Sequence, residues 1–526
     1  MRNTFLMLTC CLLFTSSMLE AQTTDDEAAT IVTTATGKVK GKLTDAVVAF
    51  KGIPYAAAPV GNLRFATPAP HPNWDGVRDY IETPPTAPFV MPKPGDINDE
   101  AVFGKGWVKG DDYLTVNIWK PVAIARALPV MVFIHGGAFA IGTSSVPIYD
   151  GTSFAKKGSI LVTFNYRLGI EGFLKIKGVP TNIGIRDQLA ALTWVRDNIA
   201  AFGGDPEQVT LFGESAGGMS VAVLTVCPAA KGLFKRAIML SGSGQSVLSS
   251  KQAEKIAASY ARELKIENNR KAWLGKSSQE LLDVQPKINV KKLKLGSDEY
   301  PDPTGGVVAF FPVIDGDLVP DIPLRTMMKQ PSSCDLLLGF NTDEANYFLV
   351  PTGLLKKIKL EIILKLAAKA VHPAPTTVIA VYRQKYPAKN RGELFSSIVT
   401  AYQFKVPTIR FADAHTASAG KTYMYEFGWQ SAVAGGVYGA YHGLALPFVF
   451  NTLESVKGDR GMIGNAPVEP GFADKIQDAF INFAKNGNPG WEPYTRDKQQ
   501  TMLINTKWEL KENPYQTELP VWDGVR

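Results

Sequence analysis

Residues 209–219 (VTLFGESAGGM) constrain the fold more than any other stretch, because a buried strand there turns abruptly into a helix. Ser215 stands at the corner, with Gly213 and Gly217 two residues away on either side. Only small neighbours let so sharp a turn close around a strained serine. If residues 219–226 continue as a helix, its first N–H groups point back at the serine. The hydroxyl would then face a site that stabilises an anion.

The G-x-S-x-G motif alone does not decide the function, because a chain with 47 glycines can contain it by chance. The chain has 526 residues, and large α/β enzymes often keep one continuous sheet and grow by insertion. The composition, 45% hydrophobic and 20% charged, is that of a globular protein. The net charge of +7 is modest, and the lysines between Lys287 and Lys294 are typical of a solvated loop. We therefore expect no nucleic-acid partner.

The N-terminus has the layout of a secretory signal peptide. Arg2 precedes an apolar run over residues 5–14, which small and polar residues follow. The run is shorter than the ~20 residues that a membrane-spanning helix needs, and no later segment is long and apolar enough. We expect cleavage after Ala21, so that residues 1–21 are removed and residues 22–526 form one domain. This layout predicts a secreted or periplasmic protein, of bacterial origin, without a membrane span.

Strands and helices alternate along the first half of the chain. Continuous apolar runs at 129–134 and 159–165 are typical of buried strands, and apolar residues recur at helical spacing over 187–202. The strand that carries Ser215 comes next. This alternation predicts a mostly parallel sheet with helices on both faces.

Other segments indicate what surrounds that sheet. Residues 31–53 alternate between apolar and polar side chains, which predicts small antiparallel strands at the sheet edge. Helical patterns over 354–370 and 406–419 predict a cap or outer layer.

Gly136 and Gly137 directly follow the predicted strand at 129–134. A glycine pair lets the backbone approach a reacting atom and aim its N–H groups at it. With Ser215 downstream, both glycines are candidates for an oxyanion hole.

A serine nucleophile needs a base to take its proton and an acid to orient that base. With such an elbow the chain order is serine, acid, histidine, which excludes His71 and His135. His372 precedes a proline in a loop, and His415 lies in a helical pattern that is more typical of a structural histidine. His442, in a glycine-rich loop after a strand, is left as the candidate base.

The candidate acid is Asp343 or Glu344. Both follow the apolar run 335–340, and the carboxyl ends of core strands are where such sheets place their chemistry. Spacing alone does not choose between the two carboxylates.

At this point the chain resembles the type-B carboxylesterases, the carboxylesterase and cholinesterase family of α/β-hydrolases. The resemblance runs from about residue 31 to the C-terminus. It is carried by residues 165–169 (NYRLG), 187–195 (DQLAALTWV), 202–206 (FGGDP), 213–218 (GESAGG) and 315–316 (DG). It implies an α/β-hydrolase fold: a large, mostly parallel central sheet flanked by helices, with small N-terminal antiparallel strands and helical cap insertions. It also implies ester hydrolysis through an acyl-enzyme, without metal or cofactor.

The resemblance assigns roles motif by motif. Ser215 matches the nucleophile, Glu344 the acid and His442 the base. The N–H donors of the oxyanion hole are matched by Gly136, Gly137 and Ala216. A second polar layer beneath the triad is matched by Glu214 and Ser241.

The departures from the family pattern concern one loop. Tyr113 stands where the family has a cysteine, and Val90 stands at about the place of its disulfide partner. We expect packing alone to hold the loop from 90 to 113. The loop also lacks the tryptophan motif with which cholinesterases bind choline, which argues against acetylcholine as substrate. Removal of the leader would leave Cys227 and Cys334, which we expect to be free thiols.

The sequence thus predicts a serine hydrolase that cleaves small to medium carboxylic esters with water as second substrate. One alternative is a catalytically inactive binding or adhesion module of the same family, although such members generally lack the serine. Another is a lipase that acts on longer chains, which would require an apolar lid that the sequence does not identify. The physiological ester and the oligomeric state stay open.

Overall fold

The computed structural model describes residues 29–526 except 94, 298 and 307. The predicted leader, with Cys10 and Cys11, lies outside the described residues. Within them, no helix combines the length and the apolar character that crossing a membrane requires.

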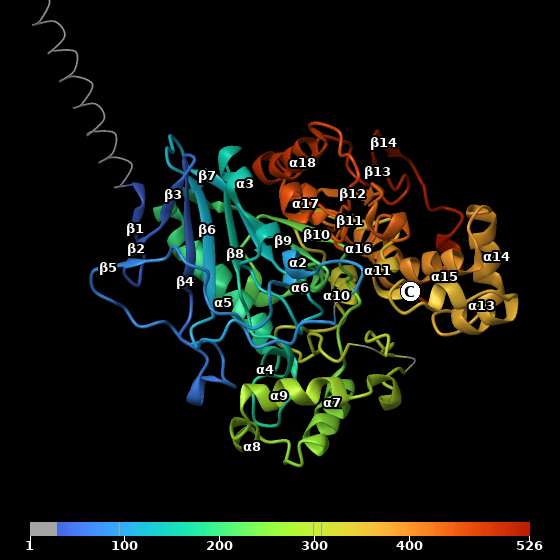
Figure 1. Ribbon diagram of the computed structural model, residues 1–526, viewed down its shortest axis with the longest axis horizontal. Helices are drawn as coiled ribbons and strands as arrows, with labels where there is room; N and C mark the ends of the chain where they lie inside the picture. Colours follow the sequence, from blue (N-terminus) through green and yellow to red (C-terminus); the bar gives the residue numbers. More distant parts are fainter. Residues whose placement is uncertain (1–28, 94, 298, 307) are drawn as a thin grey trace, which may run out of the picture.

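An eleven-stranded sheet forms the centre of the protein, in the order β14-β13-β12-β11-β10-β9-β7-β8-β6-β4-β3 (Figure 1). Neighbours from β8 to β13 in this order pair in parallel, and the pairs nearer both edges are antiparallel. The strands are β1 (Ile31–Thr33), β2 (Lys38–Lys40), β3 (Lys42–Thr44), β4 (Val47–Pro54), β5 (Val77–Asp79), β6 (Thr115–Pro121), β7 (Leu128–Ile134), β8 (Ile160–Phe164), β9 (Gly204–Glu214), β10 (Arg236–Leu240), β11 (Asp335–Asn341), β12 (Thr422–Phe427), β13 (Thr501–Ile504) and β14 (Trp508–Lys511). The predicted mostly parallel sheet is confirmed.

Helices cover the sheet and fill the insertions between its strands. They are α2 (Glu100–Phe103), α3 (Thr152–Lys156), α4 (Gly169–Phe173), α5 (Ile183–Asn198), α6 (Ala216–Val226), α7 (Ser250–Glu263), α8 (Arg270–Leu274), α9 (Ser278–Val284), α10 (Pro323–Lys329), α11 (Asn346–Leu349), α12 (Leu354–Lys357), α13 (Glu361–Ala368), α14 (Pro375–Lys385), α15 (Arg391–Thr400), α16 (Val406–His415), α17 (Leu446–Val449) and α18 (Phe472–Asn486).

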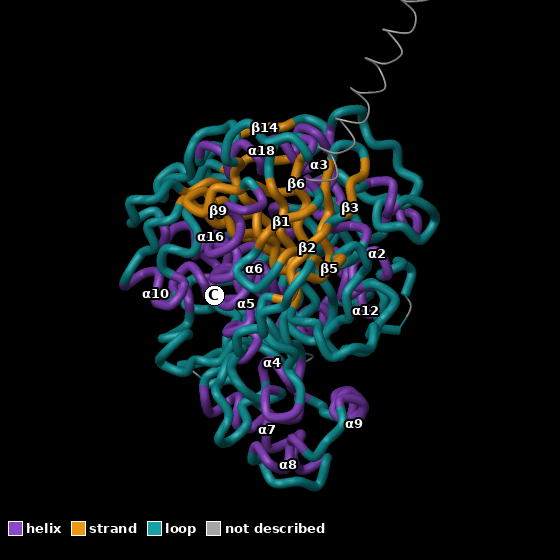
Figure 2. Tube along the Cα trace, turned by 90° about the vertical axis from the view of Figure 1, so that its left-hand side faces the viewer, coloured by secondary structure: helices purple, strands orange, loops and turns teal. Residues whose placement is uncertain are grey.

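The sheet separates two hydrophobic cores. Along β7, Val130, Val132 and Ile134 belong to one core, whereas Met131 and Phe133 belong to the other. Successive side chains of a strand point to opposite faces, so a continuous apolar run is what a strand buried on both faces requires. Helices α5 and α6 pack into the first core and α17 and α18 into the second, and Figure 2 shows the strands between them.

The N-terminal strands and the insertions lie around this centre. β1 and β2 pair antiparallel in a separate small sheet, which β5 joins in parallel, while β3 and β4 form the antiparallel edge of the main sheet. Helices α7 to α9 protrude at the bottom of Figure 1, and α13 to α15 form its right-hand end. The helical pattern at 354–370 is interrupted after α12, where Ile358 leaves helical geometry and is buried.

One ion pair is entirely buried and ties three segments together. Nη2 of Arg167 lies 2.6 Å from Oδ1 of Asp187, and neither side chain is exposed to solvent. The backbone N–H of Arg167 donates to the same carboxylate, and Nη1 donates to backbone carbonyls at 63, 64 and 66. The pair therefore joins the segment after β8 to α5 and to an N-terminal loop.

The loop without the disulfide is held by hydrogen bonds as well as by packing. The hydroxyl of Tyr113 donates to Oε2 of Glu171 over 3.2 Å. Thr86 and Val108 bond each other twice, through the backbone and through the threonine hydroxyl. The expectation that packing alone holds residues 90–113 is therefore wrong. Cys227 and Cys334 are both free and buried, as predicted.

The buried ion pair generates a stability prediction. Asp187→Ala leaves the Arg167 guanidinium buried without its carboxylate, which should lower the free energy of unfolding by about 3–5 kcal/mol. Asp197→Ala is the matched control, because the Arg196–Asp197 pair is about half exposed and should contribute at most about 1 kcal/mol. Urea and thermal unfolding curves of the two variants test this, and equal losses would contradict it.

Candidate functional site

The turn between β9 and α6 holds Ser215 in a strained conformation. Its φ of 55° and ψ of −120° lie in a region that residues with a side chain rarely adopt. The Ser215 N–H donates to the carbonyl of Leu240 on β10 over 3.0 Å, and its carbonyl accepts from the N–H of Met219 over 2.8 Å. The strained serine is thus fixed from the neighbouring strand and from its own helix.

The glycines around Ser215 are required by backbone crowding. A Cβ on Gly213 would lie 2.5 Å from the carbonyl carbon of Gly217, and one on Gly217 would lie 2.0 Å from the carbonyl oxygen of Ile134. Neither neighbour can move easily, because both are backbone. Glycine is therefore required on both sides of the serine for β7, β9 and α6 to meet at this point.

His442 and Glu344 form a hydrogen-bonded pair. Nδ1 of His442 lies 2.6 Å from Oε2 of Glu344, and Oε1 of Glu344 accepts from the backbone N–H of Asn341 over 2.7 Å. Glu344 is fully buried and His442 is 8% exposed. Because a carboxylate can only accept, Nδ1 carries the hydrogen and the lone pair of Nε2 is left free to act as a base.

Nε2 of His442 faces a second carboxylate. It lies 3.3 Å from Oε1 of Glu214, the residue before Ser215, and neither atom has a hydrogen-bond partner among the residues that the structure describes. Among the described residues, the Ser215 hydroxyl makes no hydrogen bond to Nε2. Such bonds often form only when substrate is bound.

The two carboxylates control the charge of His442. Burial lowers the pKa of the imidazole, but Glu214 and Glu344 together outweigh burial and raise it above 6.5. Burial also raises the pKa of Glu214 to about 7, against the attraction of His442. The charges of His442 and Glu214 therefore depend on each other.

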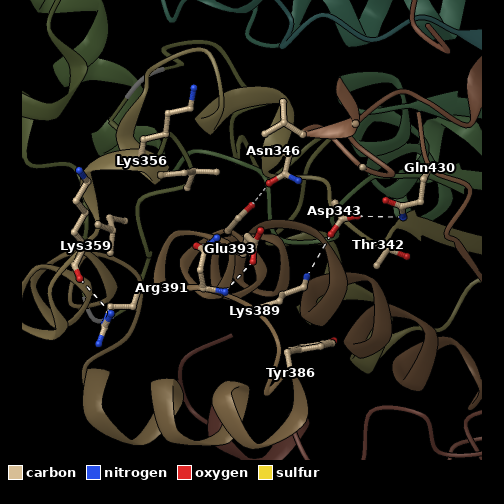
Figure 3. Close-up of a pocket in the computed structure, with 17 residues that line it drawn as sticks. Thr342, Asp343, Asn346, Lys356, Lys359, Tyr386, Lys389, Arg391, Glu393 and Gln430 are labelled. Carbon is tan, nitrogen blue, oxygen red and sulfur yellow. Dashed lines mark hydrogen bonds and ion pairs between the residues drawn. The ribbon is translucent and has the colours of Figure 1, made fainter. Parts of the chain in front are cut away.

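The structure separates Asp343 from Glu344. Oδ2 of Asp343 accepts from the backbone N–H of Ala440, and Oδ1 lies 3.4 Å from Nζ of Lys389. Asp343 thereby lines a cleft of about 810 Å³ that contains neither Ser215 nor His442 (Figure 3). Of the two candidate acids, only Glu344 is turned toward the imidazole.

The other histidines of the core have structural partners. His415 is fully buried, with Nδ1 beside the hydroxyl of Thr422 and Nε2 beside the carbonyl of Cys334, and burial lowers its pKa to about 4. The imidazole of His372 lies between the carbonyl of Val521 and its own loop. Neither approaches Ser215.

Gly136, one of the predicted oxyanion donors, lies beside the serine. A Cβ on Gly136 would lie 3.1 Å from Cβ of Ser215, so the backbone of Gly136 passes directly over the nucleophile. In the described part of the chain, the N–H groups of Gly136, Gly137 and Ala216 have no acceptor. Ser241 has a φ of 47° and donates its N–H to Gly339, but its hydroxyl makes no hydrogen bond to Glu214.

Aromatic rings that sequence reasoning missed surround the imidazole. The ring centroids of Phe404 and Phe348 lie 4.8 Å and 5.1 Å from that of His442, and Phe348 is 45% exposed. Phe404 lies in a π-helical turn, Ala401–Lys405, between α15 and α16. Phe348 follows Glu344 by four residues, so its position in the sequence is a weak indication that it lies near the site. Nothing in the sequence around Phe404 indicates that it lies near His442.

Comparisons with known proteins agree on one family. The family model described as the carboxylesterase family matches residues 28–522. A para-nitrobenzyl esterase of Bacillus subtilis is 34% identical over 497 residues, which cover 92% of this chain and 96% of the esterase. A mouse cholinesterase is 30% identical, with coverages of 91% and 83%. The solved carboxylesterase of Geobacillus stearothermophilus superposes with a TM-score of 0.80 at 34% identity, over 94% of this chain and all of that one.

The contact between His442 and Glu214 generates a prediction about the imidazole. Glu214→Gln removes a negative charge 3.3 Å from Nε2, so the imidazolium loses stabilisation and the pKa of His442 should fall. NMR titration of the protein with labelled histidine measures this, since the chain has only five histidines. Asp343→Asn, which removes a carboxylate paired with Lys389, should leave the pKa of His442 unchanged. An unchanged or raised pKa in Glu214→Gln would refute the coupling.

Proposed function

This chain belongs to the carboxylesterase family and is a serine carboxylic-ester hydrolase, and we propose that Ser215, His442 and Glu344 carry out its reaction. The observation that carries this assignment is the pair between Glu344 and His442 beside the strained Ser215. An inactive binding module would have no use for a buried acid, a base with a free lone pair and a strained hydroxyl in one place.

Acylation begins when Oγ of Ser215 attacks the ester carbonyl carbon. The Oγ–C bond forms as the hydroxyl proton passes to Nε2 of His442, and Glu344 stabilises the resulting imidazolium through Nδ1. The tetrahedral intermediate then collapses. The bond to the alcohol oxygen breaks, the imidazolium returns the proton to that oxygen, and the alcohol leaves an acyl-serine behind.

The N–H groups of Gly136, Gly137 and Ala216 stabilise the oxyanion. Within residues 29–526 as described, these N–H groups have no acceptor, and Gly136 lies beside Ser215, where negative charge develops on the carbonyl oxygen. Donors fixed in advance cost no reorganisation during the reaction, and each is worth about 10²–10³-fold in rate.

Deacylation repeats these steps with water in place of the serine. His442 takes a proton from water as its oxygen attacks the acyl carbon, and the same N–H groups hold the oxyanion. The Oγ–C bond then breaks, the proton returns to Oγ, and the carboxylic acid is released. We propose that this chemistry uses only water and the chain's own residues, with Glu214 and Ser241 as the polar layer beneath.

The aromatic rings beside His442 point to the substrate class. Phe348, Phe404 and Tyr347 offer an apolar wall next to the reacting atoms, which suits small to medium esters with an apolar or aromatic group. The name of the Bacillus relative, a para-nitrobenzyl esterase, suits the same class. We propose para-nitrophenyl and para-nitrobenzyl esters as assay substrates.

The proposal extends to the processing of the chain. The apolar run after Arg2 supports a leader cleaved after Ala21, with residues 22–526 as one hydrolase domain. The product would be a secreted or periplasmic enzyme. Mass measurement of the protein exported by a bacterial host gives the cleavage site directly.

Removal of the nucleophile tests the assignment first. Ser215→Ala should leave a folded protein but lower turnover of para-nitrophenyl esters by about 10⁶-fold. Ser159→Ala is the control, because it removes a buried hydroxyl in another loop that has no hydrogen-bond partner in the described part of the protein. If purified Ser215→Ala kept a tenth of the wild-type activity, Ser215 would not be the nucleophile.

The two neighbouring carboxylates provide a second test. Glu344→Gln should keep the fold but put the wrong tautomer on His442, lowering kcat by about 10⁴-fold. Asp343→Asn should change kcat little, because Asp343 contacts Lys389 rather than the imidazole. The reverse order of losses, with both variants folded, would transfer the role of the acid to Asp343.

A further inference from the structure

Helix α13 exposes large apolar side chains although it packs against the protein. Leu364 and Ala368 are fully buried, whereas Ile362 and Leu366 are 60% and 65% exposed on the opposite side. Ile362 and Leu366 are four residues apart, so they lie one above the other on a single outward face. Leu360, just before the helix, is also 60% exposed. Three large aliphatic side chains thus stand together in solvent, where no core uses them.

Unpaired lysines surround these apolar residues. In the part of the chain that the structure describes, none of their ammonium groups forms an ion pair or hydrogen bond; they are Lys356, Lys357, Lys359, Lys365 and Lys369. Glu361 is the single carboxylate between residues 354 and 372, and Arg383 of α14 and Arg391 of α15 already pair with it. The surface formed by Leu360, Ile362, Leu366 and the five lysines, called here the α13 face, is therefore strongly positive.

An apolar stripe flanked by lysines matches one kind of partner. Aliphatic side chains on one face of a helix enter the boundary between lipid headgroups and acyl chains, while lysines around them contact anionic headgroups. A nucleic acid would use the lysines but not the aliphatic residues, and an apolar protein surface would use the aliphatic residues but not the lysines. We propose that the α13 face docks the enzyme on a membrane surface rich in anionic lipid.

The place of the α13 face in the molecule suits this role. Helices α13 and α14 lie at one end of the protein, away from the α7–α9 lobe, so a flat surface can reach them (Figure 1). Lys356 and Lys359 also stand at the rim of the cleft that Asp343 lines (Figure 3). Docking would bring the enzyme to an interface where lipophilic esters concentrate. It needs no residue of the proposed reaction, so it stands or falls separately from the catalytic assignment.

The experiment measures how much of the exported protein, residues 22–526 after removal of the leader, sediments with vesicles. The protein should sediment with equal parts of phosphatidylglycerol and phosphatidylcholine, and much less with phosphatidylcholine alone. Binding should weaken in 0.5 M NaCl, because salt screens the lysines. Each lysine at an anionic surface changes the partition coefficient by about fivefold, so Lys357→Gln/Lys365→Gln/Lys369→Gln should bind about 100-fold more weakly. Ile362→Gln/Leu366→Gln should weaken binding at every salt concentration.

Matched variants control for total charge and for surface hydrophobicity. Lys251→Gln/Lys255→Gln/Lys271→Gln removes the same charge from α7 and α8, and Met328→Gln removes an exposed apolar side chain from α10. Both should sediment like the wild type, and any contribution of the N-terminus is common to all variants. Every variant should hydrolyse a water-soluble ester with unchanged kcat/KM, which shows that it is folded.

Three results would overturn the proposal. The first is equal sedimentation with and without phosphatidylglycerol. The second is an equal loss of binding in the α7–α8 variant and the α13 variant. The third is concentration-dependent self-association that Ile362→Gln/Leu366→Gln abolishes while vesicle binding is absent, which would make the α13 face a contact between two copies of the chain.

Discussion

The crowding of backbone around Ser215 is the constraint on which the rest of the structure depends. A strand, a helix and the loop after β7 meet so closely that Gly213, Gly217 and Gly136 have no room for a Cβ. The serine takes up a strained conformation as a result, which a well-packed surrounding must stabilise. The parallel sheet supplies that surrounding, because β7 and β10 flank β9 and are themselves buried on both faces. The two cores thus hold in place a conformation that local preferences oppose.

The same crowding explains the electrostatics. Glu214 is buried because it is the last residue of β9. Among the described residues its Oε1 has no hydrogen-bond partner, and it faces Nε2 of His442 over 3.3 Å. An unpaired buried carboxylate is expensive, and its pKa rises for that reason. It retains its charge more readily when His442 is protonated. Glu214 and His442 are therefore best treated as one coupled group, whose two ionisations belong to the pair.

Much of this architecture can be predicted from the sequence, because the patterns that indicate it are local. Apolar runs predicted β7 and β8, helical spacing predicted α5, and the glycines around Ser215 predicted a sharp turn. The choice between Asp343 and Glu344 was different. Both follow β11, and their side chains differ in their partners. Glu344 is held by Asn341 at the end of β11 and by His442, whereas Asp343 is held by Ala440 and Lys389, and most of these partners lie far along the chain.

Contacts between distant segments explain what sequence reasoning missed. Phe404 reaches His442 because a π-helical turn adds a residue between α15 and α16. No pattern in residues 401–405 predicts this turn. The buried pair of Arg167 and Asp187 joins two segments that were each recognised, but their pairing was not. Long-range geometry of this kind is set by the whole core rather than by any window of sequence.

The loop that contains Tyr113 has a consequence for how the chain reaches its final shape. A disulfide at this place would form only where an oxidant is present. The bonds of Tyr113 to Glu171 and of Thr86 to Val108 require nothing but the folded chain itself. The contacts that hold this segment are therefore indifferent to the redox potential of the surroundings in which the chain folds.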